Sequence, residues 1–110
     1  MGTVHRLPLN IVCEAIRTRS VLEFEYHHLH RVVAPYCHGL SGKGVQMLRA
    51  VQLSGASGSG AVGFGKLWFL DEIVAPRITG EHFAPHDPDY NAEDPAMAVI
   101  HCRVSLPLDR

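Results

Sequence analysis

The stretch that decides the fold is VLEFEYHHLHRVVAPY, residues 21–36. Apolar and acidic side chains alternate in its first six residues, so Leu22, Phe24 and Tyr26 are expected on one face of a half-buried strand. Residues 27–30 predict a short turn, and residues 31–36 predict the return strand of a hairpin. Pro35 predicts a sheet edge or a bulge, because proline has no backbone N–H to donate to a neighbouring strand.

Outward from this hairpin, the pattern predicts one helix before it and three strands after it. The helix is expected over about 10–19, with Asn10 as its N-cap and an apolar face that includes Ile16. The later strands are expected at Val45–Leu53, at Lys66–Leu70 and at about 96–104, the first half of which also suits a helix. Asp71–Val74 is expected to continue or turn from the strand before it, and Pro76 to end that element.

The remaining segments are expected to be loops. They are the glycine-rich His38–Gly44, the low-complexity Ser54–Gly65 and the irregular segment 76–95, which is acidic from Glu81 to Pro95. One helix followed by about five strands predicts a single, mostly β domain over residues 1–110, with its β core at about 20–75. Hairpin connections of this kind suggest a small curled sheet or open barrel.

Composition limits the kind of partner and the compartment. The formal net charge of −1 provides no global basic field, so any anion site must be local, although the eight histidines add positive charge as the pH falls. The three cysteines, Cys13, Cys37 and Cys102, are odd in number and show no CxxC spacing, which argues against a disulfide framework and for a reducing compartment. No apolar signal core or membrane-length apolar run occurs, so a cytoplasmic protein without membrane contact is expected.

Several motifs occur in an order that carries a family resemblance. They are Ala15-Ile16, Phe24-Glu25-Tyr26, Arg31–Tyr36, Leu48-Arg49-Ala50, Trp68–Ile73 and Phe83. In this order the chain resembles the WYL domain family from roughly Ile11 to Phe83. The most specific pieces are Arg-x-x-x-Pro at residues 31–35 and aromatic-x-Leu-Asp-x-Ile at residues 68–73.

The resemblance implies an SH3-like or Sm-like β-barrel from a bacterial transcription regulator or phage-defence protein that senses nucleotides or nucleic acid. Arg31 matches the family's arginine before the proline, Lys66 stands near a second usual arginine, and Trp68 takes the aromatic place. Two departures alter the expected site: Gln46-Met47-Leu48 replaces the Trp-Tyr-Leu signature, and Glu72 replaces an arginine. No helix-turn-helix segment is present, so the module is expected to act through a homo-oligomer or a partner regulatory protein.

The candidate ligand-binding residues combine cations, aromatics and an amide. They are Arg31, Tyr36, Arg49, Gln52, Lys66 and Trp68. All of these except Lys66 have a structural alternative: Arg31 would pair with Glu23 or Glu25 across the hairpin, and Arg49 with some carboxylate. Tyr36 and Trp68 would be core or interface residues, and this is the favoured interpretation for the tryptophan. Gln46 and Gln52 would be solvated. They lie opposite the strand face formed by Val45, Met47, Arg49, Val51 and Leu53.

A metal site and an active site are weaker hypotheses. The cluster His27, His28, His30, Cys37 and His38 has the residue types of a zinc site but no standard zinc spacing, so solvent-facing hairpin residues are favoured. An active site built on Cys37 and His38 is not favoured, because adjacent residues of a strand face opposite ways. The other candidate groups are carboxylates that suit a solvated surface: Asp87, Asp89, Glu93 and Asp94. The glycines of 54–60 match no nucleotide-binding fingerprint and suit a flexible loop, which a ligand would order.

Two functions are therefore expected from different classes. The leading hypothesis is a non-enzymatic sensing module, without cofactor, that binds a nucleotide, an oligonucleotide or another anion. The alternative is a structural or interaction module in which the tail Met97–Val104 pairs with another copy or another protein.

Overall fold

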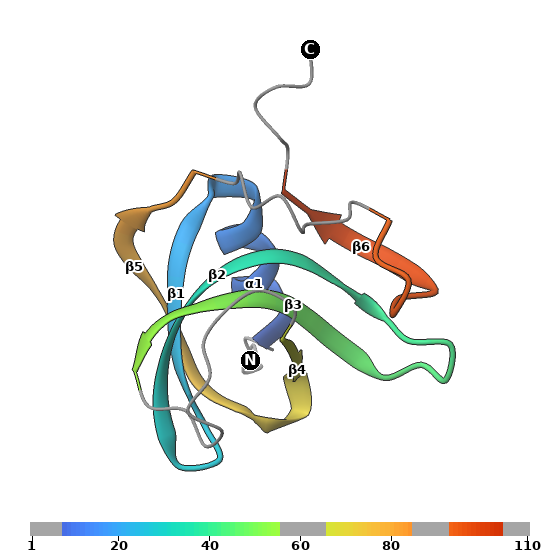
Figure 1. The fold of residues 1–110 in the computed structure, drawn as a ribbon, viewed down its shortest axis with the longest axis horizontal. Helices are drawn as coiled ribbons and strands as arrows, with labels where there is room; N and C mark the ends of the chain where they lie inside the picture. Colours follow the sequence, from blue (N-terminus) through green and yellow to red (C-terminus); the bar gives the residue numbers. More distant parts are fainter. Residues whose placement is uncertain (1–7, 56–65, 85–92, 105–110) are drawn as a thin grey trace, which may run out of the picture.

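A curled antiparallel sheet and one helix make up the fold in a computed structural model, which describes residues 8–55, 66–84 and 93–104 (Figure 1). The elements are α1 (Pro8–Thr18), β1 (Ser20–Tyr26), β2 (Leu29–Leu40), β3 (Gln46–Gly55), β4 (Leu67–Phe69), the 3-10 turn η1 (Leu70–Glu72), β5 (Ile73–His82) and β6 (Val99–Arg103). The strand order is β4-β3-β2-β1-β5, with β6 paired to β2. The end strands β4 and β5 are joined through η1 but do not pair, so the sheet is curled and not closed.

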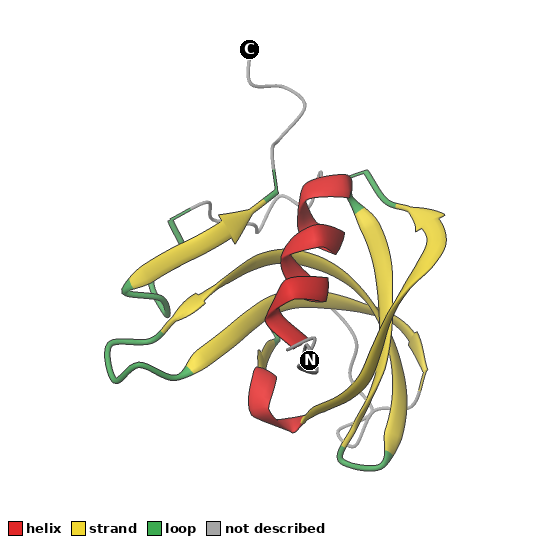
Figure 2. Ribbon diagram, turned by 180° about the vertical axis from the view of Figure 1, so that it is seen from behind, coloured by secondary structure: helices red, strands yellow, loops and turns green. Residues whose placement is uncertain are grey.

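Helix α1 begins slightly earlier than expected and covers the sheet (Figure 2). Pro8 is its first residue, a position where the missing N–H of proline has no helical partner to lose. Asn10 lies inside the helix, so its expected role as N-cap is wrong. Val12, Ala15 and Ile16 are fully buried, which is the i, i+3, i+4 spacing of a helix with one apolar face.

The predicted hairpin is confirmed. Leu22, Phe24 and Tyr26 are buried, and Tyr26 pairs with Leu29 across a two-residue turn. Both turn residues, His27 and His28, have positive φ angles of 53° and 67°, the conformation that two-residue hairpin turns require.

Strand β2 is longer than expected, since residues 38–40 of the predicted loop belong to it. Pro35 fits inside this central strand because β1 stops pairing with it at Val33 and β6 begins only at Cys37. The register of β2 with β3 also shifts between Pro35 and Cys37, so the expected bulge is present.

Strand β5 continues through Pro76, so the prediction that this proline ends the element is wrong. Ala75 has a positive φ of 53°, and the register of β1 with β5 shifts between Glu23 and Glu25, which marks an irregularity at this point. Because β5 ends the strand order, a proline there removes no ladder hydrogen bond on its open side. Of the expected irregular segment 76–95, residues 85–92 lie outside the described part, as do residues 56–65 of the expected loop Ser54–Gly65.

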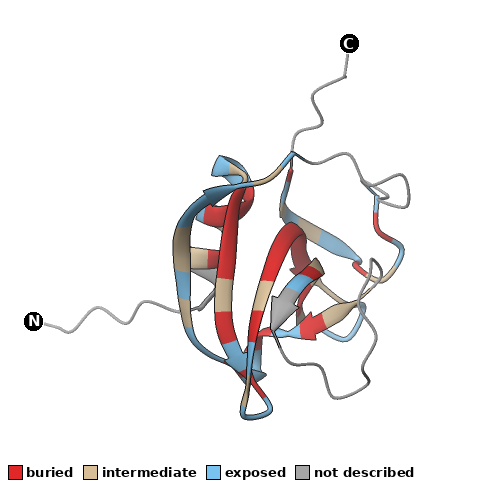
Figure 3. Cartoon of the chain, turned by 60° about the vertical axis from the view of Figure 1, so that its left-hand side comes forward, coloured by how far each residue is buried: buried red, intermediate tan, exposed pale blue. Residues whose placement is uncertain are grey.

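The core is filled mainly from the central strands (Figure 3). Leu48, Ala50 and Gln52 form a fully buried face of β3, whereas on the more apolar face Val45 and Leu53 are exposed and Met47 is buried. The indole of Trp68 explains this choice, because it lies over the small Ala50 and donates from Nε1 to the Ala50 carbonyl oxygen at 3.3 Å. The expected solvation of Gln52 is therefore wrong.

A disulfide joins Cys13 in α1 to Cys102 in β6, whose Cα atoms lie 5.9 Å apart. This overturns the expectation that the cysteines are unpaired, and only Cys37 is free and buried. The bond connects residues 89 positions apart, so no local spacing could have revealed it. Among the helices that the structure describes, none is long and apolar enough to cross a membrane.

Candidate functional site

Arg31 is a buried cation at the start of β2. It is only 4% exposed, and its Cζ lies 5.6 Å from the centroid of the Tyr26 ring and 5.4 Å from that of Trp68. Its Nη2 donates to the Tyr26 carbonyl oxygen at 3.0 Å, and its Nη1 to Gln52 Oε1 at the long distance of 3.5 Å. Its Nε is buried and has no hydrogen-bond partner.

In the part of the chain that the structure describes, no carboxylate pairs with the charge of Arg31. None of the ion pairs within residues 8–55, 66–84 and 93–104 includes this guanidinium. The expected partner Glu23 instead binds His30 and Arg77. Burying a charge without a counterion costs several kcal/mol, which the two aromatic rings and the two hydrogen bonds offset only in part.

A second cation lies at the same tryptophan. Lys66 directly precedes β4, and its Nζ lies 5.2 Å from the centroid of the Trp68 ring. Trp68 itself is almost fully buried and packs edge-to-face on Phe24 and Tyr26. The indole is therefore a core residue, as favoured from the sequence, and its contribution to the site is to hold two cations.

Tyr26 belongs to this cluster although the sequence did not single it out as a ligand residue. Its hydroxyl oxygen accepts a hydrogen bond from the Phe69 N–H at 3.0 Å. Burial raises the pKa of Tyr26, with the neighbouring Glu72 acting in the same direction and the Phe69 N–H against it. Glu72 also binds His27, so this negative charge lies at the turn. The available signal was the hairpin register: Tyr26 pairs with Leu29 across the two-residue turn, so Arg31, two residues further along β2, lies diagonally opposite Tyr26.

We call this group the Arg31 cluster: Tyr26, Arg31, Gln52, Lys66 and Trp68. Arg49 lies elsewhere, because Cys37 is its partner in the β2–β3 ladder, whereas Arg31 pairs with Gly55 at the other end. Tyr36 is also outside the cluster, since its buried ring packs on Phe83 with centroids 5.4 Å apart.

Arg49 forms a bidentate ion pair with Asp94. Its Nε and Nη2 lie 2.6 Å and 2.9 Å from the two carboxylate oxygens, and the Ala96 N–H also donates to Asp94 at 3.0 Å. The hydrogen bond from Arg49 holds the pKa of Asp94 below its usual range, and the same bond raises the pKa of Arg49. Asp94 is buried, so its expected place on a solvated surface is wrong. The carboxylate alternative for Arg49 is thus the one observed.

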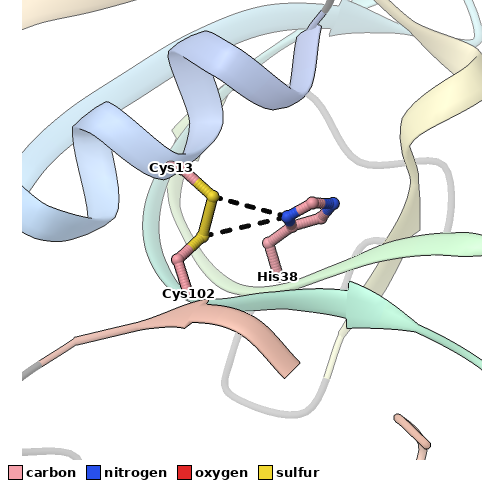
Figure 4. Close-up of side chains that lie close together, drawn as sticks. All are labelled: Cys13, His38 and Cys102. Atoms are coloured by element: carbon pink, nitrogen blue, oxygen red, sulfur yellow. Dashed lines mark hydrogen bonds between the residues drawn. A yellow bond between two sulfur atoms is a disulfide. The ribbon is translucent and has the colours of Figure 1, made fainter. Parts of the chain in front are cut away.

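A sulfur and imidazole group lies between α1, β2 and β6 (Figure 4). His38 Nδ1 lies 3.5 Å from Cys13 Sγ and 3.8 Å from Cys102 Sγ, and its Nε2 is 2.7 Å from Gln46 Oε1. Burial lowers the pKa of His38, the Gln46 hydrogen bond opposes this, and His101 lowers the pKa further. The ring is therefore neutral at neutral pH.

The histidine-rich hairpin does not assemble as a metal site. His27 binds Glu72 and His30 binds Glu23. The Cys37 thiol contacts Met97 Sδ at 3.5 Å, and burial raises its pKa to about 11. Of that hypothesised set, His38 alone lies among potential ligand atoms, and its neighbours Cys13 and Cys102 come from distant parts of the chain.

The two motifs that carried the family resemblance lie together in space. Arg31 from the first motif contacts Trp68 from the second. No family model, curated protein or solved structure matches this chain. The relationship to the WYL family therefore stays a prediction.

Proposed function

We propose that this chain is a non-enzymatic sensing module that binds a phosphate-bearing anion, a nucleotide or single-stranded nucleic acid, at the Arg31 cluster. The observation that carries the proposal is the buried guanidinium of Arg31, which has no carboxylate partner among the described residues and whose Nε finds no hydrogen-bond partner there. A phosphate would neutralise this charge and accept a hydrogen bond from the Nε–H of Arg31. Guanidinium groups bind phosphate with strong, charge-assisted hydrogen bonds.

Lys66 supplies the second charge of the proposed site. It lies within reach of the same indole as Arg31 and is only partly buried, so an incoming anion meets its ammonium group first. The weak 3.5 Å bond between Arg31 Nη1 and Gln52 is the contact that a ligand would most readily replace. Arg49 and Tyr36, also expected to bind ligand, are left out of the proposed site because each already has a structural partner.

A bacterial regulatory or phage-defence role in the cytoplasm is part of the proposal and depends on the family resemblance. The cysteines no longer support the cytoplasmic location, because Cys13 and Cys102 form a disulfide and are not free thiols.

Calorimetric titration with inorganic phosphate, ATP and a short oligothymidylate tests the proposal. Wild-type protein is expected to bind at least one of these, with an affinity that falls as salt rises. Arg31→Met and Lys66→Met should each weaken binding, whereas Lys43→Met, which removes an exposed lysine in the β2–β3 loop, should leave it unchanged. Binding that all three variants share equally, or no binding to any probe by the wild type, would overturn the assignment.

A second candidate is an interaction module that acts through homo-oligomerisation or strand pairing with a partner. Val99 on β6 is 48% exposed, and β6 pairs on one side only, with β2, among the strands described. Met97 and Val104 at the ends of this tail are buried against the chain's own core, so its outer edge is the part left for a partner. Light scattering over a concentration series should show an oligomer that Val99→Lys dissociates; a monomer at every concentration would exclude self-association.

A further inference from the structure

Three potential metal ligands converge on one point although the chain brings them from three elements. Cys13 comes from α1, His38 from β2 and Cys102 from β6, and their ligand atoms lie within 4.8 Å of one another. His38 is fully buried, whereas both cysteines are only half-buried. A reductant or a metal ion therefore has access to the sulfur side of the group.

The spacing of these atoms matches zinc geometry. With zinc bonds of about 2.3 Å to sulfur and 2.0–2.1 Å to nitrogen, a tetrahedral ion separates a nitrogen from a sulfur ligand by about 3.6 Å. His38 Nδ1 already lies 3.5 Å and 3.8 Å from the two sulfurs. Only the sulfur–sulfur distance differs, since two thiolates on one zinc lie about 3.8 Å apart. Breaking the disulfide and separating its sulfurs would complete the three-ligand face.

The imidazole is already oriented for this role. Gln46 Oε1 accepts a hydrogen bond from His38 Nε2 at 2.7 Å, so the ring proton lies on Nε2. The lone pair of Nδ1 then points to the two sulfurs. Metal-binding histidines usually donate their second ring N–H to an oxygen acceptor, which fixes the ring in this way.

We propose that reduction of the Cys13–Cys102 disulfide opens a zinc site formed by Cys13 Sγ, Cys102 Sγ and His38 Nδ1. A cellular dithiol gives two electrons and two protons to the disulfide and becomes a disulfide itself, leaving two thiols on this chain. These thiols lose two protons to solvent when they bind the zinc ion. The fourth position is open to water, as in other sites with three protein ligands. α1 and β6 are thus joined covalently in the oxidised protein and through the metal in the reduced one.

Metal titration of the reduced full-length chain tests this site. The protein is treated with a phosphine reductant, kept anaerobic and titrated with Co²⁺, then with Zn²⁺. We expect one Co²⁺ per chain with the absorption of a tetrahedral, sulfur-bound ion, its displacement by Zn²⁺, and no such spectrum from the oxidised protein. Absence of this spectrum from folded, reduced protein would overturn the proposal.

Variants separate the assigned ligands from general metal binding. Cys102→Ser should lower the sulfur-to-cobalt charge-transfer absorption by half or more. His38→Ala should weaken zinc binding at least tenfold, and Gln46→Met should weaken it about 10–100-fold. Cys37→Ala removes the one thiol outside the group and should bind as the wild type does. The fold of His38→Ala and Gln46→Met is checked by circular dichroism in the oxidised state, where the disulfide is retained. Equal zinc affinity of wild type, His38→Ala and Gln46→Met would refute the site.

Discussion

Loss of the Cys13–Cys102 bond should lower the free energy of unfolding by several kcal/mol. The perturbation is the double variant Cys13→Ser, Cys102→Ser, compared with oxidised wild type in the presence of a chelator. The bond closes a loop between residues 89 positions apart, and the loss of chain entropy in the unfolded state for a loop of that size amounts to about 4–5 kcal/mol. The bond also secures β6, which pairs with β2 through only a short ladder.

Urea unfolding followed by tryptophan fluorescence measures this loss. Trp68 is the only tryptophan of the chain and is buried in the core, so its emission reports global unfolding. With an m-value of about 1–3 kcal/mol/M, the urea midpoint should fall by roughly 1.3–5 M in the double variant. Reductant should produce a similar fall in the wild type and in Cys37→Ala, which keeps the bonded pair. The reasoning fails if the wild type unfolds at the same midpoint with and without reductant, or if thiol titration of the oxidised, denatured protein finds three free thiols.

The other predictions concern the ion pair and the close approach of β6. Asp94→Ala removes the bidentate ion pair with the largely buried Arg49 side chain and should lower the free energy of unfolding, measured in urea, by about 3 kcal/mol; a loss below about 0.5 kcal/mol would show that the pair is not structural. Because the pKa of Asp94 is lowered in the fold, its stabilisation should be present above about pH 4 and decline as the pH falls through the folded pKa, so the difference between wild type and Asp94→Ala should shrink in acid. Equal differences at pH 7 and pH 2.5 would contradict this. Gly39→Ala places a Cβ 2.1 Å from the Val99 carbonyl oxygen and should cost about 1–3 kcal/mol by displacing β6; an unchanged urea midpoint would show that β6 does not lie against Gly39.

Local pattern was sufficient for the hairpin because its information lies in adjacent residues. The alternation at Leu22, Phe24 and Tyr26 set the buried face of β1, and a turn within the expected residues 27–30, at His27 and His28, set the pairing. Pro76 misled because a proline breaks only a strand that needs its N–H, and the sequence does not show that β5 ends the strand order.

The faces of β3 and the cysteine pairing depended on contacts between distant segments. The pattern of this strand left its buried face open, and the structure buries Leu48, Ala50 and Gln52, the face on which the indole of Trp68 reaches the Ala50 carbonyl oxygen. Pairing of Cys13 with Cys102 required the docking of α1 beside β6, which no spacing encodes.

The candidate site was predictable in part. The motifs singled out Arg31, Lys66 and Trp68, and the fold brings these three together. That no described carboxylate pairs with Arg31 could not be predicted, because Glu23 was an equally available partner along the chain and instead binds His30 and Arg77.

Thermal unfolding of wild type and Arg31→Met, with and without ATP, separates a ligand-binding Arg31 from a structural one. Without ligand, the variant should lie within about 1 kcal/mol of wild type, because relief of the buried charge offsets the lost hydrogen bonds and ring contacts. A ligand at one hundred times its Kd adds about 2.7 kcal/mol, so the wild-type Tm should rise by about 10 °C while that of Arg31→Met does not change. The account is contradicted if Arg31→Met loses about 3 kcal/mol or more without ligand and ATP leaves the wild-type Tm unchanged, since Arg31 would then be a structural residue.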